Sequence, residues 1–220
     1  MKKYLLLFIS FLFSSSFYAQ EIGSSPLGQK DFQLWLDAGL KYKVNKKLDI
    51  LFEAAHRREN NLTDVNENYI EVQAQTDPLK FLVLSGGYRL SGWNKKELVN
   101  RLFAYAKFDF EADRFRFQYR IRYDYNFNNQ IKELPANVRN KIKVKYRTRK
   151  FPIDPYIAYE LYFRTNYQDR RFSQQRMDLG LDYSISKKQS ISVYFRYQQQ
   201  LNAVAPAKNY VLGVSYSIDI

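Results

Sequence analysis

The sequence of 220 residues contains no cysteine, one histidine, eight glycines and six prolines. Without cysteine, disulfide bonds, thiolate metal sites and a lipid anchor on an N-terminal cysteine are excluded. Sparse glycine and proline argue against a soluble sandwich, whose strands are interrupted by such residues after about five to eight positions. Beyond the N-terminal segment no apolar run reaches about 18 residues, so helical membrane spans are not expected.

The N-terminal segment has the layout of a secretory signal peptide. Two lysines precede an apolar run from Leu5 to Phe13, and a serine-rich stretch follows and ends near Ala19. The apolar run is shorter than the roughly 20 residues that a membrane-spanning helix needs, which disfavours the alternative of an uncleaved anchor. We therefore predict a cleaved signal peptide at 1–20 and, since no linker follows, one exported domain at 21–220.

Acidic residues are outnumbered, with 22 Asp and Glu against 35 Lys and Arg and a formal charge of +13. A basic balance is typical of nucleic-acid binding, but an exported protein meets little nucleic acid, so we expect none as a partner. The counter-charges that we expect are anionic lipopolysaccharide, anionic small solutes and salt bridges inside the protein.

Apolar and polar residues alternate with a period of two, which indicates β-strands. The clearest case is Arg114 to Phe127, where seven Phe, Tyr and Ile residues at odd positions alternate with Arg, Gln, Asp and Asn at even positions. A helix would mix these two sets on every face. The segments with this alternation run roughly 32–44, 47–58, 67–76, 79–90, 98–111, 114–127, 138–148, 154–164, 174–185, 189–200 and 208–220.

These segments favour an all-β, antiparallel up-and-down transmembrane barrel. Most are long enough for a tilted crossing of the hydrocarbon layer, and short connections alternate with longer ones, as in outer-membrane barrels. Because bacterial barrels have an even number of strands, we expect about twelve, with Glu21–Lys30 supplying one more, or else ten. A soluble secreted barrel or sandwich is the rival architecture.

The free-energy cost of exposing a charged side chain to lipid decides which face of each strand points inward. The odd positions of 138–148 are all Lys or Arg, and each would cost about 2 to 4 kcal/mol if it faced lipid near the midplane. The charged face must therefore line the lumen, and the apolar face must contact lipid. Tyr42, Phe127 and Tyr183, near strand ends, are expected in the aromatic girdles at the two membrane interfaces.

This assignment predicts a polar lumen with more basic than acidic side chains. The expected basic cluster comprises Arg101, Arg116, Arg120, Arg122, Arg139, Lys141, Lys143, Lys145, Arg176 and Arg196, and its expected acidic partners are Glu53, Glu71, Glu160, Asp178 and Asp182. Rings of Arg and Lys lower the barrier for anions, so one hypothesis is a narrow porin-like channel or a binding protein for anionic solutes. The alternative is a structural barrel whose lumen is plugged by salt bridges.

A lipid-modifying enzyme is the hypothesis from a different class. Such barrels use a lipid-facing His with a Ser nucleophile, and His56, the only histidine, is predicted on the lipid side near an outer rim. Ala54 and Arg58 are its neighbours on that face, and its strand offers no Ser to activate. We therefore predict no catalytic residues and no enzymatic activity.

Three other features of the sequence are candidate sites. Asp64, Asn66 and Glu67 are calcium-ligand types in an expected outer loop, but they lack the spacing of a known calcium loop, so a solvated loop is favoured. Gly86-Gly87 is expected to form a bulge or kink, and 128–137 either a constriction folded into the lumen or a mobile loop. No metal and no cofactor are predicted.

A series of short motifs follows along nearly the whole mature chain. They are Trp35, the Asn45 turn, His56-Arg57-Arg58, Glu97-Leu98-Val99-Asn100-Arg101, Arg120 to Tyr123, the Arg139 strand, Tyr159-Glu160-Leu161-Tyr162-Phe163 and Gln175-Arg176-Met177-Asp178-Leu179-Gly180. In this order they resemble the outer-membrane proteins of Bacteroidota classified as domain of unknown function 2490. The resemblance implies a β-barrel in the outer membrane and brings no established activity. We expect the barrel to be a monomer among outer-membrane lipids and lipopolysaccharide.

Overall fold

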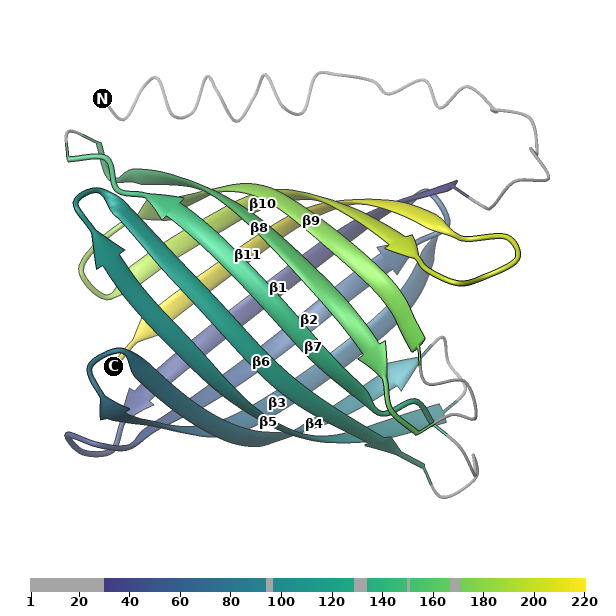
Figure 1. The fold of residues 1–220 in the computed structure, drawn as a ribbon, viewed down its shortest axis with the longest axis horizontal. Coiled ribbons are helices and arrows are strands. Elements are labelled where there is room, and N and C mark those ends of the chain that lie inside the picture. The colour runs from purple at the N-terminus through teal and green to yellow at the C-terminus, as the bar shows by residue number, and fades with distance from the viewer. Residues whose placement is uncertain (1–29, 94–96, 129–133, 150, 167–170) are drawn as a thin grey trace.

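The computed structural model describes residues 30–93, 97–128, 134–149, 151–166 and 171–220 as one closed β-barrel (Figure 1). Its strands are β1 (Lys30–Lys43), β2 (Asp49–Glu59), β3 (Asp64–Leu79), β4 (Leu82–Trp93), β5 (Glu97–Ala112), β6 (Phe115–Phe127), β7 (Asn137–Tyr146), β8 (Ile153–Arg164), β9 (Arg171–Ser184), β10 (Gln189–Gln200) and β11 (Lys208–Asp219). The described residues contain no helix long and apolar enough to cross a membrane. The predicted all-β barrel is confirmed. The predicted signal peptide at 1–20 lies outside the described residues.

The barrel closes with eleven strands in the described part of the chain, not with the twelve or ten that we expected. Consecutive strands pair antiparallel, whereas β1 pairs parallel with β11, with Trp35 opposite Gly213. Both edges of β1 are therefore occupied, and no further strand fits between β1 and β11. The expectation was wrong because it assumed antiparallel pairing throughout, which only an even number of strands allows.

The two ends of the barrel differ in their connections. We call one end of the barrel the "turn end" and the opposite end the "loop end". The turn end carries the β1–β2, β3–β4, β5–β6, β7–β8 and β9–β10 connections. Ile220 lies at the turn end, where its N–H donates to the carbonyl of Lys41, whereas Lys30 lies at the loop end opposite Lys208. Figure 1 shows the turn end on the left, with the C-terminus, and the loop end on the right.

The β2–β3 connection is shorter than expected. It comprises only residues 60–63, three of which have positive φ: Asn60, Asn61 and Leu62. Asp64, Asn66 and Glu67 therefore belong to β3 and not to a loop, and Glu67 forms an ion pair with Arg57 at 2.6 Å. In the described ranges no group of three or more His, Cys, Asp or Glu side chains is arranged to hold a metal ion.

Side chains sort to the two faces as the period-two pattern predicted. Along β6, Phe115, Phe117, Tyr119, Ile121, Tyr123 and Tyr125 are exposed, whereas Arg122, Asp124 and Asn126 are buried. The same holds for β1, where Gln33 and Trp35 are buried inside and Leu36 is 40% exposed outside. The barrel is thus apolar outside and polar inside, the reverse of a water-soluble protein.

Aromatic side chains on the outer face gather in pairs near both ends. At the turn end Phe81 stacks on Phe110, and Phe115 packs edge-on against Tyr146. At the loop end lie the pairs Tyr125–Phe127, Phe163–Phe172 and Tyr197–Tyr210. Aromatic pairs at both ends are typical of the girdles that we expected, and further aromatic residues such as Tyr119 and Phe195 are exposed between the ends.

Gly86 and Gly87 do not form the expected bulge. Both pair in regular register with Ala74 and Gln73 on β3 and with neighbouring residues on β5. A Cβ on Gly87 would meet the Phe103 ring and the backbone of β3. The glycine thus serves a close approach, because it makes room for an aromatic ring that lies against the inner wall.

Candidate functional site

Side chains separate two cavities in the part of the lumen that the described residues line. The loop-side chamber has a volume of about 700 Å³, and the turn-side chamber one of about 430 Å³. Four residues line both of them: Asp37, Lys141, Tyr194 and Arg196. We call these four residues, together with Asp178, the septum, because they lie where the chambers meet.

Arginine dominates the wall of the loop-side chamber. Its described lining residues include ten arginines and one lysine against seven carboxylates. The cations are Arg57, Arg89, Arg101, Arg120, Arg122, Arg139, Lys141, Arg164, Arg171, Arg176 and Arg196, and the carboxylates are Asp37, Glu53, Glu59, Glu67, Glu71, Asp124 and Glu160. Period-two strands place them there, because every second residue of each strand points into the lumen.

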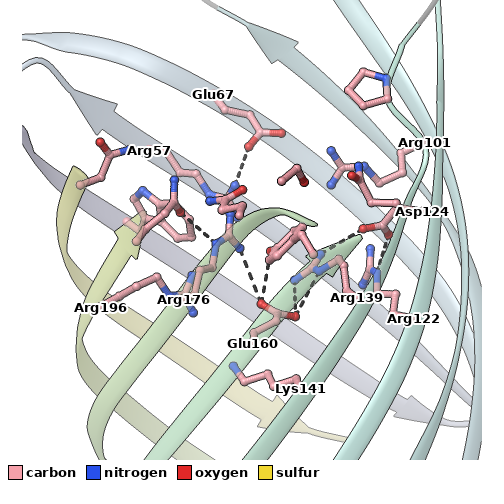
Figure 2. A pocket seen from close by; sticks show the side chains of 18 of the residues that line it. Arg57, Glu67, Arg101, Arg122, Asp124, Arg139, Lys141, Glu160, Arg176 and Arg196 are labelled. Atoms are coloured by element: carbon pink, nitrogen blue, oxygen red, sulfur yellow. Dashed lines mark hydrogen bonds and ion pairs between the residues drawn. The ribbon is translucent and has the colours of Figure 1, made fainter. Parts of the chain in front are cut away.

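Glu160, on β8, is the most heavily coordinated carboxylate of this chamber (Figure 2). Its side chain is 2% exposed, and its Oε1 accepts hydrogen bonds from Arg120 at 3.0 Å and from Arg139 at 2.8 Å. The Tyr162 hydroxyl donates to Oε2 at 3.2 Å, and Arg176 approaches Oε2 to 3.8 Å. A buried carboxylate with several cationic donors stays ionised and fixes those donors in place.

A chain of alternating charges runs from Glu160 over the wall. Arg139 also binds Asp124 at 3.1 Å, and Arg122 binds Asp124 at 2.6 Å. Arg122 then reaches Glu71 at 3.4 Å, and Glu71 is held by Arg89 at 2.6 Å. The chain links β8, β7, β6, β3 and β4, and its Arg122–Glu71 contact joins β6 to β3, which share no backbone hydrogen bonds.

The septum contains a bidentate ion pair between Arg196 and Asp178. Arg196 donates from Nε and Nη2 to the two oxygens of Asp178, at 2.6 and 3.0 Å. Lys141 donates to Asp178 from β7 at 3.0 Å. In the turn-side chamber, Lys143 and Lys145 both pair with Asp182. The charged groups of Arg196, Asp178 and Lys141 thus hold one another in place between the two chambers.

Aromatic rings hold several of the guanidinium groups. Three arginines lie within cation–π distance of Trp35: Arg57 at 4.0 Å, Arg196 at 4.8 Å and Arg176 at 5.2 Å. Tyr162 contacts Arg139 and Arg176, each at 4.7 Å. Rigid rings against planar guanidinium groups restrict side-chain motion, so the chamber is pre-organised.

The structure separates the predicted site residues into three places. The loop-side chamber is lined by Arg101, Arg120, Arg122, Arg139, Lys141, Arg176, Arg196, Glu53, Glu71 and Glu160. The turn-side chamber is lined by Lys143, Lys145, Asp178 and Asp182, together with Lys141 and Arg196, which line both chambers. Arg116 lines neither chamber and instead pairs with Asp109 near the turn end.

Several lumen residues were missed by the sequence analysis. Trp35, Tyr69 and Tyr162 are buried on the inner face, and none of the three is among the predicted site residues. Their position parity is that of the charged residues on the same strand, and this signal was available. Arg89 and Asp124 were likewise detectable by parity.

The other candidate features lie away from the chambers or at their mouth. His56 is on the outer face of β2, where its Nδ1 lies 2.7 Å from Oδ1 of Asn68. Residues 129–133 of the expected constriction lie outside the described residues. Pro135 lines the loop-side chamber, and its carbonyl accepts a hydrogen bond from Asn126.

Comparisons with known proteins gave a family match and structural likenesses. A family model described as "Protein of unknown function (DUF2490)" matches residues 32–209. A solved "KdgM porin" is similar with a TM-score of 0.44 and 12% identity, covering 81% of this chain and 94% of that one. A second structure, "KdgM porin in complex with disordered oligogalacturonate", has a TM-score of 0.46 and 14% identity, covering 82% and 93%. No curated protein matches the sequence.

Proposed function

This chain belongs to the DUF2490 family, whose description assigns no activity, and we therefore propose its function from the geometry of its lumen. We propose that it is an outer-membrane barrel with a narrow, porin-like lumen that admits or binds small anionic solutes. The observation that carries this proposal is the excess of arginine on the wall of the loop-side chamber. Rows of fixed cations lower the electrostatic barrier for anions and raise it for cations.

The membrane location is supported by the outer surface. Large apolar side chains such as Ile70, Leu98 and Leu179 are more than 60% exposed on it. Strands of 10 to 16 residues are long enough for a tilted crossing of about 9 to 11 residues. The turn end would then face the periplasm and the loop end the exterior. We also infer export by a cleaved signal at 1–20, and a monomer embedded in lipid and lipopolysaccharide.

Ion selectivity in planar bilayers tests the proposal. The refolded barrel is expected to conduct under a KCl gradient with a reversal potential of the sign set by chloride. The variant Arg101→Glu should move the reversal potential toward that of potassium, because no carboxylate lies within ion-pair distance of Arg101 in the described part of the chain. The matched control is Arg149→Glu, whose side chain is 71% exposed beyond the turn end. A channel that prefers potassium would contradict the proposal.

The second candidate function is a closed structural barrel, favoured by the septum. The Arg196–Asp178–Lys141 contacts lie between the two chambers, and a lumen blocked there conducts nothing. Silence of the wild-type protein in bilayers, combined with conductance of a variant lacking these contacts, would support this candidate over an open channel.

A lipid-modifying activity receives no support from the surroundings of His56. Among the described residues its side-chain hydrogen-bond partner is Asn68, an amide that cannot act as a nucleophile. We therefore do not propose an enzyme. Incubation of wild type and His56→Ala with lipid A and phospholipid tests this, and products formed by the wild type alone would contradict it.

A further inference from the structure

Arg176 and Arg101 of the loop-side chamber contact far less carboxylate than several of its other arginines. Arg196, Arg139 and Arg89 each have a carboxylate oxygen within 2.8 Å. The nearest carboxylate oxygen to Arg176 is 3.8 Å away, beyond hydrogen-bond distance. Arg101 donates from Nε to the amide oxygen of Asn126 at 2.6 Å and forms no ion pair with the described residues.

Arg176 is nevertheless held firmly in place. Its guanidinium group contacts the ring of Trp35 at 5.2 Å and the ring of Tyr162 at 4.7 Å. Its Nε donates to Oε1 of Gln198 at 2.9 Å. The plane of the group is thereby fixed from two rings and one amide, while its two Nη atoms have no hydrogen-bond acceptor among the described residues. Such a fork matches the two oxygens of a carboxylate or a phosphate.

Glu160 does not compete for this fork. Its Oε1 is already bound by Arg120 and Arg139, and its Oε2 by Tyr162. A ligand on Arg176 therefore breaks no hydrogen bond and leaves no buried carboxylate unpaired. Other bound arginines of the chamber, such as Arg196 on Asp178, would have to give up a buried partner first.

The chamber has the size and the charge for such a ligand. Its volume of about 700 Å³ is in the range of small-molecule sites, and its cations exceed its carboxylates among the described lining residues. Figure 2 shows Arg176 and Arg101 on opposite sides of the pocket, with Glu160 between and below them. Arg101 thus supplies positive charge to the part of a ligand that points away from Arg176.

We propose that the loop-side chamber is a binding site for a small organic oxoanion, with a carboxylate or phosphate group on the Nη fork of Arg176 and further negative charge toward Arg101. The inference rests on the proposed anion preference of the lumen. It goes further in requiring one fixed site that distinguishes oxoanions from chloride.

Trp35 provides a direct readout of this site. It is 4% exposed and lies against Arg176, so occupation of the fork changes the surroundings of its ring. The sequence contains two tryptophans, and Trp93→Phe leaves Trp35 as the sole indole. The full-length Trp93→Phe barrel, folded in detergent, is titrated with sodium phosphate and separately with sodium succinate, at ionic strength held constant with sodium chloride. A saturable change in emission is expected with at least one of the two, which identifies the preferred group.

Arg176→Lys tests the fork, because lysine keeps the charge but loses the planar pair of donors. We expect the affinity to fall about tenfold or more, whereas Arg116→Lys, outside both chambers, should leave it unchanged. Heat-modifiable gel mobility establishes that each variant is folded. No saturable response, or equal affinity of the Trp93→Phe barrel with and without Arg176→Lys, would overturn the site. A barrel that prefers anions in bilayers but shows no such binding retains the proposed function and loses only this inference.

Discussion

The ring of Tyr194 on β10 occupies the space beside Gly213, the residue directly opposite on β11, so closely that a Cβ at Gly213 would overlap it. Tyr156 stands in the same relation to Gly180 on β9. Each ring thus lies against the inner wall over a paired glycine. Tyr194 also borders both chambers, so this close approach helps to set the width of the septum.

Gly213→Ala is expected to destabilise the barrel by about 1 to 3 kcal/mol, because the added methyl group must displace Tyr194. Urea unfolding of the detergent-folded protein, followed by gel mobility, measures this. The control is Gly39→Ala on β1, where a Cβ meets its nearest atom, Oγ of Ser217, at an ordinary 3.7 Å. Equal stability of the two variants would show that Tyr194 is not confined as described.

Cysteines at Leu36 and Val214 are expected to form a disulfide under mild oxidation. The two residues are opposite each other in the parallel β1–β11 pair, and the natural chain has no cysteine to interfere. Non-reducing electrophoresis of the folded protein detects the bond. Leu36→Cys combined with Leu179→Cys is the control, because Leu179 lies on β9. Cross-linking of the control alone would mean that β1 and β11 are not neighbours.

Glu160→Gln is expected to cost roughly 3 kcal/mol or more of stability. The change leaves Arg120 and Arg139, both largely buried, without one of their charged partners. The same unfolding measurement applies. The comparison is Glu111→Gln, whose ion pair with Arg147 is about half exposed on both sides and should change stability by no more than about 1 kcal/mol. A loss no larger than that of Glu111→Gln would contradict the central role of Glu160.

Removing the septum pair with Arg196→Ala and Asp178→Ala together is expected to raise single-channel conductance severalfold. The double change takes away both charges of one pair, so the net charge of the lumen is unchanged. Arg147→Ala with Glu111→Ala removes a similar pair at the turn end and serves as the control. If both double variants conduct like the wild type, the septum does not limit the path.

The strands and the facing of their side chains were predictable from local sequence. A period of two over ten or more residues is a short-range signal, and β6 follows it residue by residue. The strand number was not predictable in this way. It depends on the parallel pairing of Leu34 with Leu212, at opposite ends of the chain, which no local pattern records.

The sequence predicts which residues line the lumen, but it does not predict which of these residues contact one another. Parity places Arg122 and Glu71 inside, yet their contact at 3.4 Å spans 51 positions and crosses the intervening strands. It depends on barrel curvature and on the Phe103 ring, over which Arg122 lies at 3.8 Å. Parity likewise places Trp35 on the polar face with Gln33 and Asp37, but the three arginines around its ring come from distant parts of the chain and cannot be predicted from local sequence.

Because the number of strands is odd, the first strand starts at one end of the barrel and the last strand finishes at the other. In an even-stranded barrel both lie at the same end. Lys30 lies at the loop end and Ile220 at the turn end, so the described chain runs from one end of the barrel to the other. In the membrane orientation that we propose, reporter domains joined before Lys30 and after Ile220 would report from opposite compartments. Closure of the barrel therefore joins two strands, β1 and β11, that run in the same direction, whereas an even-stranded barrel closes on an antiparallel pair.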